Sequence, residues 1–421
     1  MKQLTCVDLF AGCGGLSLGL EISGFRPLLF SELNISAAET YMINRKGIDL
    51  IPVGDVYSLT DDNLKLLKVY WAQRGIKDID LVCGGPPCQG YSGIGHRRTF
   101  KLDKKEIPSN HLYEEMVRVI REIRPKAFLF ENVKGLLSAK WDPNGQKGEI
   151  FKDVLRAFKT LTEYHVRWEL VYAKDYGVPQ NRPRVLMVGY RNDVIYPEHQ
   201  GLLFEAPELN YEKPSAVSNA FLPKAHGVPP SLEDLLSDLI DPNYEKRGMT
   251  EFYPSEPKNE IQKQFRTHNG KALTSVSEQE YSNHAPYIKS KFAHMIANNG
   301  EIPAEYKTKK FAQRVFPRSW GADGPNITAT SLPEDYVHFS QPRSPTVREW
   351  ARIQTFPDWY EFAGSRTTGG RRRAGDPSKG LWGRDVPKYT QIGNAVPVML
   401  AQKVGAHLRK VITGEVRISQ K

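Results

Sequence analysis

The feature that most restricts the fold is an alternation of short apolar runs with helix-like segments over residues 4–190. Such an alternation predicts strands separated by helices, and therefore an α/β fold built on a mostly parallel sheet with helices on both faces. The expected strands are residues 5–10, 27–31, 79–83, 127–131 and 184–189. The expected helices are residues 16–23, 37–44, 62–73, 112–123 and 151–161.

The pattern changes after residue 192. Residues 193–342 are rich in Pro, Asn, His and Tyr and contain few periodic segments. Residues 344–353 predict a helix, in which Thr346 is a candidate cap with Glu349 three residues later. An Arg- and Gly-rich loop follows, and residues 397–411 predict a carboxyl-terminal helix. We predict a catalytic domain (1–192), a second domain (193–363), a basic loop insertion (364–387) and a returning segment (388–421).

Composition narrows the class of partner. The 421 residues suit two or three domains, and a formal net charge of +10 favours a polyanionic partner, with nucleic acid first among them. The four cysteines lie in the first quarter of the chain without paired CxxC clusters, so neither a disulfide framework nor a metal site is expected. No signal peptide and no membrane span are expected either, which makes a reducing cytoplasm the expected location, or a nucleus if the source has one.

One loop places a cysteine directly after an apolar run. Residues 79–83 read Ile-Asp-Leu-Val-Cys, a buried-strand pattern, and the following Gly-Gly-Pro-Pro ends the strand just before Cys88. In a parallel α/β sheet, ligands bind beyond the carboxyl ends of the strands, so a thiol there can face a substrate. The alternative is a buried, unreactive free cysteine. The loop alone does not decide between a nucleophile and a core residue.

A glycine-rich loop follows the first expected strand and opens a helix. It reads Asp-Leu-Phe-Ala-Gly-Cys-Gly-Gly over residues 8–15, and Glu32 lies 20 residues beyond Gly12 at the end of the second strand. This spacing suits a carboxylate that binds ribose hydroxyls. Ser17 occupies the third glycine position of a dehydrogenase fingerprint, so the loop favours an adenosine-bearing cofactor without a pyrophosphate. Asp55 could hold an adenine amino group, or be an ordinary turn residue.

A second carboxylate and a set of polar residues complete the expected site. Glu131 ends the apolar run 127–130, which places it at the same sheet edge as Cys88. Gln180, Arg182 and Arg184 alternate just before the next strand, so their side chains should point the same way. Acids at strand ends and surface arginines usually have no specific role. Three aligned donors over a crevice could hold phosphate or a base carbonyl.

Six segments in this order resemble the motifs of the cytosine-5 DNA methyltransferases. They are residues 8–15, 85–92, 131–133, 180–184, 348–354 and 391–397. The resemblance covers nearly the whole chain. It implies a Rossmann-like S-adenosylmethionine-dependent methyltransferase domain with a mixed, mostly parallel sheet, and a smaller target-recognition domain. It also implies methyl transfer from S-adenosylmethionine to carbon 5 of a cytosine in double-stranded DNA.

The same resemblance assigns roles to individual residues. Cys88 would attack carbon 6 of the cytosine, Glu131 would bind ring nitrogen 3, Arg184 would bind the exocyclic oxygen, and Arg182 would orient the site. The base would be flipped out of the duplex at a cost of roughly a few kcal/mol. The expected cofactor-pocket residues are Phe10, Gly12, Gly14, Glu32, Leu33, Asp55, Val56, Pro86, Leu112 and Asn394. The expected DNA contacts are Gln89, Ser92, Arg97, Arg98, Gln180, Arg371, Arg372 and Arg373.

One departure from the family and several alternatives bear on function. Leu33 stands where several members carry an aromatic residue that stacks on adenine, so that contact should be weaker here. An RNA methyltransferase of the same fold and a catalytically silent DNA-binding regulator are the alternative functions, although the intact Cys88, Glu131 and arginine pair oppose the regulator. A restriction nuclease or phage-defence protein is a possible partner, and the sequence does not reveal the target site.

Overall fold

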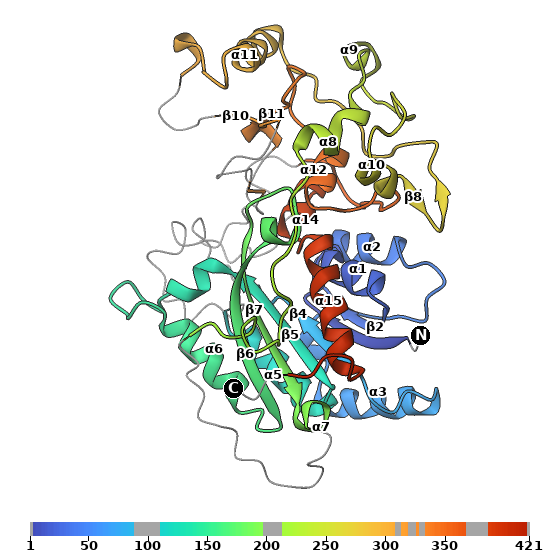
Figure 1. Cartoon of the computed structure of the whole chain (residues 1–421), viewed down its shortest axis with the longest axis vertical. Helices are drawn as coiled ribbons and strands as arrows, with labels where there is room; N and C mark the ends of the chain where they lie inside the picture. Colours follow the sequence, from blue (N-terminus) through green and yellow to red (C-terminus); the bar gives the residue numbers. More distant parts are fainter. Residues whose placement is uncertain are drawn as a thin grey trace.

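The computed structural model describes residues 3–87, 110–196, 213–307, 313–318, 326–327, 333–367 and 386–418. The chain forms a sheet-containing lobe and, above it in Figure 1, a lobe of short helices. The first lobe is built from the amino-terminal half of the chain together with its last helix. Residues from the middle of the chain form the second lobe.

A seven-stranded sheet forms the centre of the first lobe, with the order β3-β2-β1-β4-β5-β7-β6. Neighbouring strands from β3 to β5 run parallel, whereas β7 is antiparallel to both β5 and β6. The strands are β1 (Leu4–Leu9), β2 (Phe25–Ser31), β3 (Ile51–Val53), β4 (Leu81–Gly84), β5 (Ala127–Val133), β6 (Tyr164–Tyr172) and β7 (Pro183–Arg191). The predicted mixed, mostly parallel α/β sheet is therefore confirmed.

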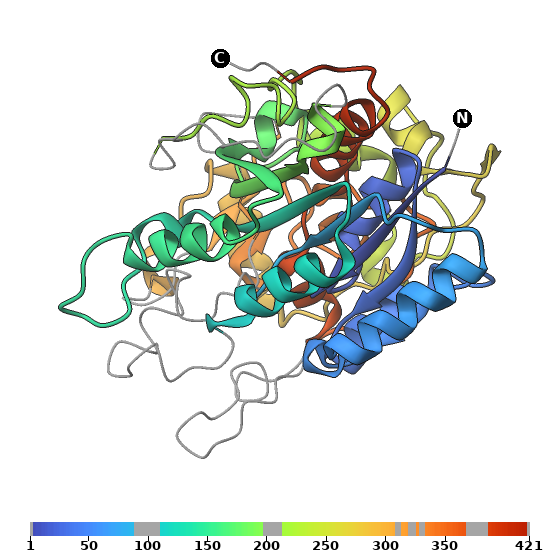
Figure 2. The same cartoon turned by 90° about the horizontal axis from the view of Figure 1, so that it is seen from below.

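Helices cover the two faces of this sheet, as the view along it in Figure 2 shows. Strand alternation sends Val7 and Leu9 to one face and Cys6 to the other, so each face has its own apolar core. The first core lies under α3 (Asp61–Gln73), α5 (Leu112–Ile123) and α6 (Glu149–Lys159). The second lies under α1 (Gly15–Ile22) and α15 (Val398–Ile412), while α2 (Ile35–Ile43) packs on Phe30 through Tyr41.

The second lobe has little sheet and a core of its own. Its helices are α8 (Leu232–Leu236), α9 (Tyr244–Arg247), α10 (Glu260–Phe265), α11 (Pro286–Ala297) and α12 (Val347–Ile353). Its strands are the pairs β8 (Thr267–His268) with β9 (Lys271–Ala272), and β10 (Arg314–Val315) with β11 (Tyr336–Val337). Trp350 of α12 lies in an apolar cluster that also contains Leu18 of α1 and Ile392 of α14 (Lys388–Asn394). The two lobes therefore share apolar packing.

The structure also shows where the second lobe is joined to the first. After the short helix α7 (Asn192–Ile195), residues 213–222 return along the sheet: Ala216 and Phe221 are buried against the core under α15, and the backbone N–H of Ala216 donates to the carbonyl of Trp168 at 3.1 Å. The boundaries of the four segments proposed from the sequence stay predictions. Thr346 caps α12 through a capping box with Glu349, as expected, although the helix begins at Val347 and not at Ser344.

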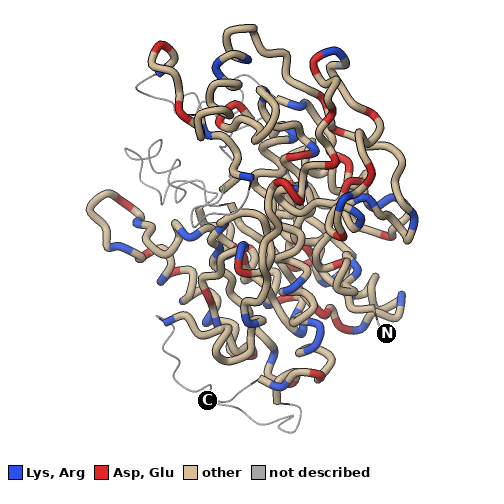
Figure 3. Tube along the Cα trace, turned by 45° about the horizontal axis from the view of Figure 1, so that its top comes forward, with Lys and Arg blue, Asp and Glu red and all other residues tan. Residues whose placement is uncertain are grey.

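Two further observations concern solvent and membranes. Lys and Arg are distributed over both lobes and are interspersed with Asp and Glu (Figure 3). No helix among the described residues combines the length and the apolar character needed to cross a membrane.

Candidate active site and cofactor cleft

Five neighbouring strands end at the same edge of the sheet. Since β3, β2, β1, β4 and β5 are adjacent and parallel, their carboxyl ends meet there. The segments after β3, β2, β1 and β4 carry, in that order, Asp55, Glu32, Gly12 and Pro86. Glu131 lies near the carboxyl end of β5 itself. The fold thus brings the predicted cofactor residues and the predicted base-binding carboxylate to one edge.

The glycine-rich loop is bonded to the carboxylate of Glu32. The backbone N–H of Gly12 donates to Glu32 Oε2 at 2.8 Å, and that of Asn34 donates to Glu32 Oε1 at 2.7 Å. Burial raises the pKa of Glu32, against the effect of these two donors. A Cβ placed on Gly12 would meet no heavy atom within 4 Å, so the loop borders open space. An oriented carboxylate beside open backbone fits a ribose-bearing ligand.

The other predicted cofactor residues differ in exposure. Leu33 follows Glu32 and is 74% exposed, as an apolar contact for a planar ring requires. Asp55 is exposed and caps a short 3-10 helix, since its Oδ1 accepts from the N–H of Tyr57 at 3.1 Å. The turn role and the adenine role of Asp55 are thus compatible. Val56 is buried under α3.

Three more of the predicted cofactor residues lie at element ends. Phe10 directly follows β1 with a φ of 57°, and its N–H donates to Ser31 Oγ at 3.2 Å. Leu112 is the first residue of α5 and is partly buried against the core. Asn394 is the last residue of α14 and is exposed.

Glu131 forms an ion pair with Arg184. Arg184 Nε lies 2.5 Å from Glu131 Oε1, and the two side chains are only 10% and 12% exposed. A Cβ on Gly85 would lie 2.7 Å from Glu131 Oε2, so a side chain there would displace the carboxylate or the loop after β4. The ion pair lies between the strands β5 and β7 and the loop after β4. The Arg184 guanidinium orients one oxygen of the Glu131 carboxylate.

Asn132 holds the loop that leads to Cys88. It was not among the predicted site residues. Its Nδ2 donates to the carbonyl of Pro86 at 3.2 Å, and its Oδ1 accepts from the N–H of Val133 at 2.9 Å. The side chain is buried. The sequence does contain a signal for this role: a polar residue inside an apolar strand, next to a candidate catalytic acid. A buried amide at such a position must find hydrogen-bond partners.

Arg182 is fully buried and turns toward the end of α14. Its Nη2 donates to the carbonyl of Gly393 at 2.7 Å and to that of Asn394 at 3.3 Å, and its Nη1 donates to the carbonyl of Ile327. Burial, with Arg184 nearby, lowers the pKa of Arg182 well below its usual range. Arg182 thus fixes the backbone around the site, in line with its expected orienting role, which stays a prediction.

Gln180 is also fully buried, and its amide is bonded within the protein. Its Nε2 donates to Gln354 Oε1 at 2.7 Å and to the carbonyl of Ile353 at 3.1 Å, and its Oε1 accepts from the N–H of Ile327 at 3.2 Å. Gln180 and Arg182 therefore bind the N–H and the carbonyl of Ile327, whereas Arg184 pairs with Glu131. The three side chains do not form the single row of free donors expected from the alternation. A DNA contact by Gln180 stays a prediction and would require these bonds to open.

Comparisons with known proteins decide the class. A sequence profile of the C-5 cytosine-specific DNA methylases matches residues 4–410. The chain belongs to this family. It is 31% identical over 417 residues to the Type II methyltransferase M.DdeI of Desulfomicrobium norvegicum, covering 96% of this chain and 88% of that protein. It is 30% identical over 411 residues to M.Eco47II of Escherichia coli, covering 95% of this chain and 78% of that protein.

The solved structures agree with the fold of this methylase. A protein described as a prophage-encoded DNA modification methyltransferase (E. coli) superposes with a TM-score of 0.65 at 22% identity, covering 98% of this chain and all of that chain. The sequence-based identification of the family, the fold and the enzyme class is therefore confirmed: the methylase is a DNA (cytosine-5)-methyltransferase.

Several predicted site residues of the methylase lie outside the described residues, and their roles stay predictions. They are Cys88, Gln89, Ser92, Arg97, Arg98, Arg371, Arg372 and Arg373. The other three cysteines, Cys6, Cys13 and Cys83, are free and buried.

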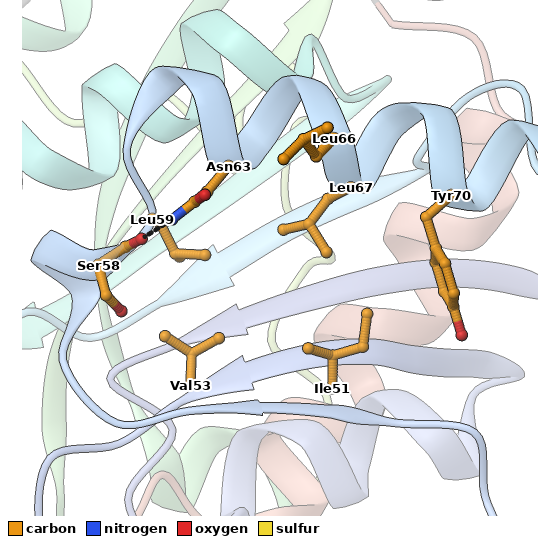
Figure 4. A pocket seen from close by; sticks show the side chains of 8 residues that line it. All are labelled: Ile51, Val53, Ser58, Leu59, Asn63, Leu66, Leu67 and Tyr70. Atoms are coloured by element: carbon orange, nitrogen blue, oxygen red, sulfur yellow. Dashed lines mark hydrogen bonds between the residues drawn. The ribbon is translucent and has the colours of Figure 1, made fainter.

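The methylase also has an apolar pocket beside the predicted cofactor residues, since the carbonyl of its lining residue Val53 accepts from the N–H of Glu32 at 2.9 Å. It measures about 550 Å³ and lies between β3 and α3, with Ile51 and Val53 facing Leu67 and Tyr70 in Figure 4. None of its lining residues belongs to the predicted cofactor, catalytic or DNA-binding sets. The cofactor cleft is therefore assigned from the strand ends and not from this pocket.

Proposed function

We propose that this methylase modifies cytosine at a specific sequence of double-stranded DNA, with S-adenosylmethionine as methyl donor, as part of a restriction-modification or phage-defence system. The observation that carries the proposal is the alignment of Glu32, Pro86 and the Glu131–Arg184 pair along adjacent strand ends. The same edge offers one acceptor for a ribose and a charge pair for a planar base. Its curated relatives are named Type II methyltransferases, which supports the biological setting.

The cofactor cleft fits S-adenosylmethionine through groups of this chain. Glu32 would accept from the ribose hydroxyls, Asp55 would accept from the adenine amino group, and Leu33 would give the ring an apolar contact. The backbone at Gly12 leaves room for close approach, since no heavy atom occupies the space of its missing Cβ. When bound, S-adenosylmethionine supplies an activated methyl group.

Cytosine requires activation because its carbon 5 is a poor nucleophile. In the proposed scheme the thiolate of Cys88 forms a bond to carbon 6, and the electron pair of the 5,6 double bond becomes available at carbon 5. Glu131 holds or protonates ring nitrogen 3, and Arg184 binds the exocyclic oxygen, so charge that develops on the ring is stabilised. Carbon 5 gains the methyl group, and S-adenosylhomocysteine is the leaving group. A base then removes the proton from carbon 5, and the restored 5,6 double bond expels the Cys88 thiolate.

The DNA must reach these groups as an extruded nucleotide. Base flipping gives access to a site recessed at the sheet edge, at a cost of roughly a few kcal/mol that protein contacts repay. Residues 93–110 and the arginines 371–373 are the proposed contacts near the flipped base and the phosphates. Residues from about 193 to 363 would read base edges and so select the target.

Bisulfite sequencing of DNA from a host that expresses the chain tests the proposal. We expect complete protection of one cytosine within a single recurring sequence, and no protection with the Cys88→Ala variant. Uniform conversion of host DNA, together with methyl incorporation into transfer RNA in vitro, would favour the RNA alternative. No methyl incorporation into either polymer would overturn the proposed function.

A further inference from the structure

The glycine-rich loop has buried contacts in addition to its bond with Glu32. The hydroxyl of Tyr360 donates to the carbonyl of Cys13 at 2.6 Å. Arg45 in turn donates from Nη1 to the Tyr360 hydroxyl at 3.2 Å. Tyr360 is fully buried and Arg45 almost so. A tyrosine from the far end of the chain therefore supplies the partner of a carbonyl within the cofactor loop.

Gly14 shows how closely Tyr360 packs against the loop. Gly14 has a φ of 84° and precedes the first turn of α1. A Cβ at this position would lie 2.7 Å from the Tyr360 hydroxyl oxygen and 3.0 Å from Arg45 Nη1. The left-handed backbone and the missing side chain are both needed for this contact. The path of the loop between Gly12 and α1 is thus fitted to the hydroxyl of Tyr360.

The backbone of Tyr360 is attached to the second lobe through Arg348. Arg348 Nη2 donates to the carbonyl of Tyr360 at 2.9 Å and to Ser277 Oγ at 2.8 Å, and its Nη1 donates to the carbonyl of Pro357 at 3.0 Å. The N–H of Arg348 donates to the carbonyl of Glu278 at 3.1 Å. Arg348 is fully buried, so these bonds are shielded from water. Tyr360 is therefore fixed relative to residues 277–278 of the second lobe.

We propose that Tyr360 is a positioning residue for S-adenosylmethionine, which orients the Cys13–Gly14 backbone of the cofactor loop and is itself held by Arg348 from the second lobe. The inference rests on the proposed use of this cofactor. Its physical basis is the carbonyl of Cys13: without the hydroxyl, this buried oxygen and Arg45 both lose a partner. The loop then relaxes, and the N–H of Gly12 no longer holds Glu32 where a ribose would meet it.

The test compares two tyrosine-to-phenylalanine variants of the full-length chain. Tyr360→Phe removes only the hydroxyl that bonds to Cys13. Tyr253→Phe is the matched control, because the Tyr253 hydroxyl donates to Asp358 Oδ2 at 2.8 Å in the same lobe without touching the cofactor loop. The readouts are the Kd of S-adenosylhomocysteine by calorimetry without DNA, and KM for S-adenosylmethionine and kcat with host DNA of mapped target sequence.

We expect Tyr360→Phe to raise both the Kd and the KM by about tenfold, as the loss of one buried hydrogen bond implies, with kcat within about twofold of wild type. Tyr253→Phe should leave all three within about twofold. KM does not depend on the fraction of folded enzyme, so it remains informative if some of the variant unfolds. Unchanged Kd and KM, or a loss confined to kcat, would overturn the inference. A wild-type chain that binds no S-adenosylhomocysteine would instead overturn the proposed function.

Discussion

Arg184 reaches Glu131 because β7 runs antiparallel to β5, which aligns Arg184 with Val133 and places its Nε 2.5 Å from Glu131 Oε1. A parallel β7 would present its first residues at the opposite edge of the sheet. The reversed strand brings Arg184, near its start, and Arg182, just before it, to the edge where the parallel strands end. Both members of the charge pair are therefore carried by sheet strands and not by loops.

Glu131→Gln keeps the size of the side chain but removes its charge and its ability to bind and release a proton. We expect kcat to fall by about 10²- to 10³-fold, as for other groups that stabilise charge on a reacting ring. DNA affinity should change little. The control is Glu163→Gln, which removes a half-exposed carboxylate 2.7 Å from Arg124 on the surface and should leave kcat unchanged. Equal activity of the two variants would contradict the assigned role of Glu131.

Gly85→Ala should impair catalysis by steric displacement. The new methyl group would lie 2.7 Å from Glu131 Oε2, so the carboxylate or the loop must shift. We expect a loss of about tenfold or more in kcat, consistent with the sensitivity of catalysis to displacements near 1 Å. Gly54→Ala is the matched control, because a Cβ there meets no atom within 4 Å. Wild-type kcat in Gly85→Ala would show that the close approach has no catalytic consequence.

Asn132→Ala removes the amide that holds the carbonyl of Pro86. We expect kcat to fall by about tenfold while KM for the cofactor stays constant, because the change loosens the approach to Cys88 and not the cleft around Glu32. The buried carbonyl left without its partner should also lower the free energy of unfolding by about 1–3 kcal/mol. Asn63→Ala, which removes an exposed bond to the carbonyl of Ser58, should alter neither quantity.

The role of Cys88 can be tested by trapping. Cys88→Ala should abolish methyl transfer and leave DNA binding largely intact. DNA that carries 5-fluorocytosine at the mapped target should form a stable covalent adduct with the wild-type chain, since fluorine cannot leave as the proton does. Peptide mapping should locate the adduct at Cys88. A fully active Cys88→Ala variant, or an adduct at another residue, would exclude the proposed nucleophile.

Stability should decrease in acid through Glu349. Burial alone would raise its pKa, but the Arg343 guanidinium 2.6 Å away and the N–H of Thr346 lower it to about 2. A carboxylate whose pKa is lower in the folded than in the unfolded state stabilises the protein at any pH above its unfolded-state pKa, here near 4.5. The contribution is lost as the pH falls toward the folded-state pKa of about 2. The shift corresponds to about 3 kcal/mol at neutral pH.

Urea unfolding of Glu349→Gln and wild type at pH 7, 5, 4 and 3 provides the measurement. We expect the variant to be less stable by about 3–5 kcal/mol at pH 7, since Arg343 keeps a buried charge without its partner. The difference between the two free energies of unfolding should narrow below about pH 4.5. A difference that stays constant down to pH 3 would contradict the assignment. His338 beside this pair adds to acid sensitivity, because burial lowers its pKa to about 3 and its unfolded form takes up a proton first.

The sequence predicted most of the sheet because its apolar runs are short, buried on both faces and separated by periodic helices. The strand β6 (Tyr164–Tyr172) was missed, because Arg167 and Glu169 interrupt its apolar pattern at the edge of the sheet. No range was predicted for the strand β3 either. It has just three residues, Ile51–Val53, which is too short for a periodic signal.

The site residues also fall into two groups, those that the sequence places and those that it does not. Residues that end strands, such as Glu32 and Glu131, can be placed from the sequence because parallel strands end at one edge. Tyr360 and Arg45 could not, since their relationship to the glycine loop depends on how two distant segments pack. The burial of Gln180 was likewise unpredictable, because its partners Ile327 and Gln354 lie far along the chain.

The packing of α1 against α15 has a consequence for biosynthesis. Gly19 of α1 meets α15 so closely that a Cβ would lie 2.4 Å from the side chain of Ala401. The helix α1 therefore receives its partner only when residues 398–412 have been synthesised. An incomplete chain can form neither this core nor the helix that follows the cofactor loop in its final setting. A chain that stops before α15 therefore leaves the apolar core on this face of the sheet without one of its two covering helices.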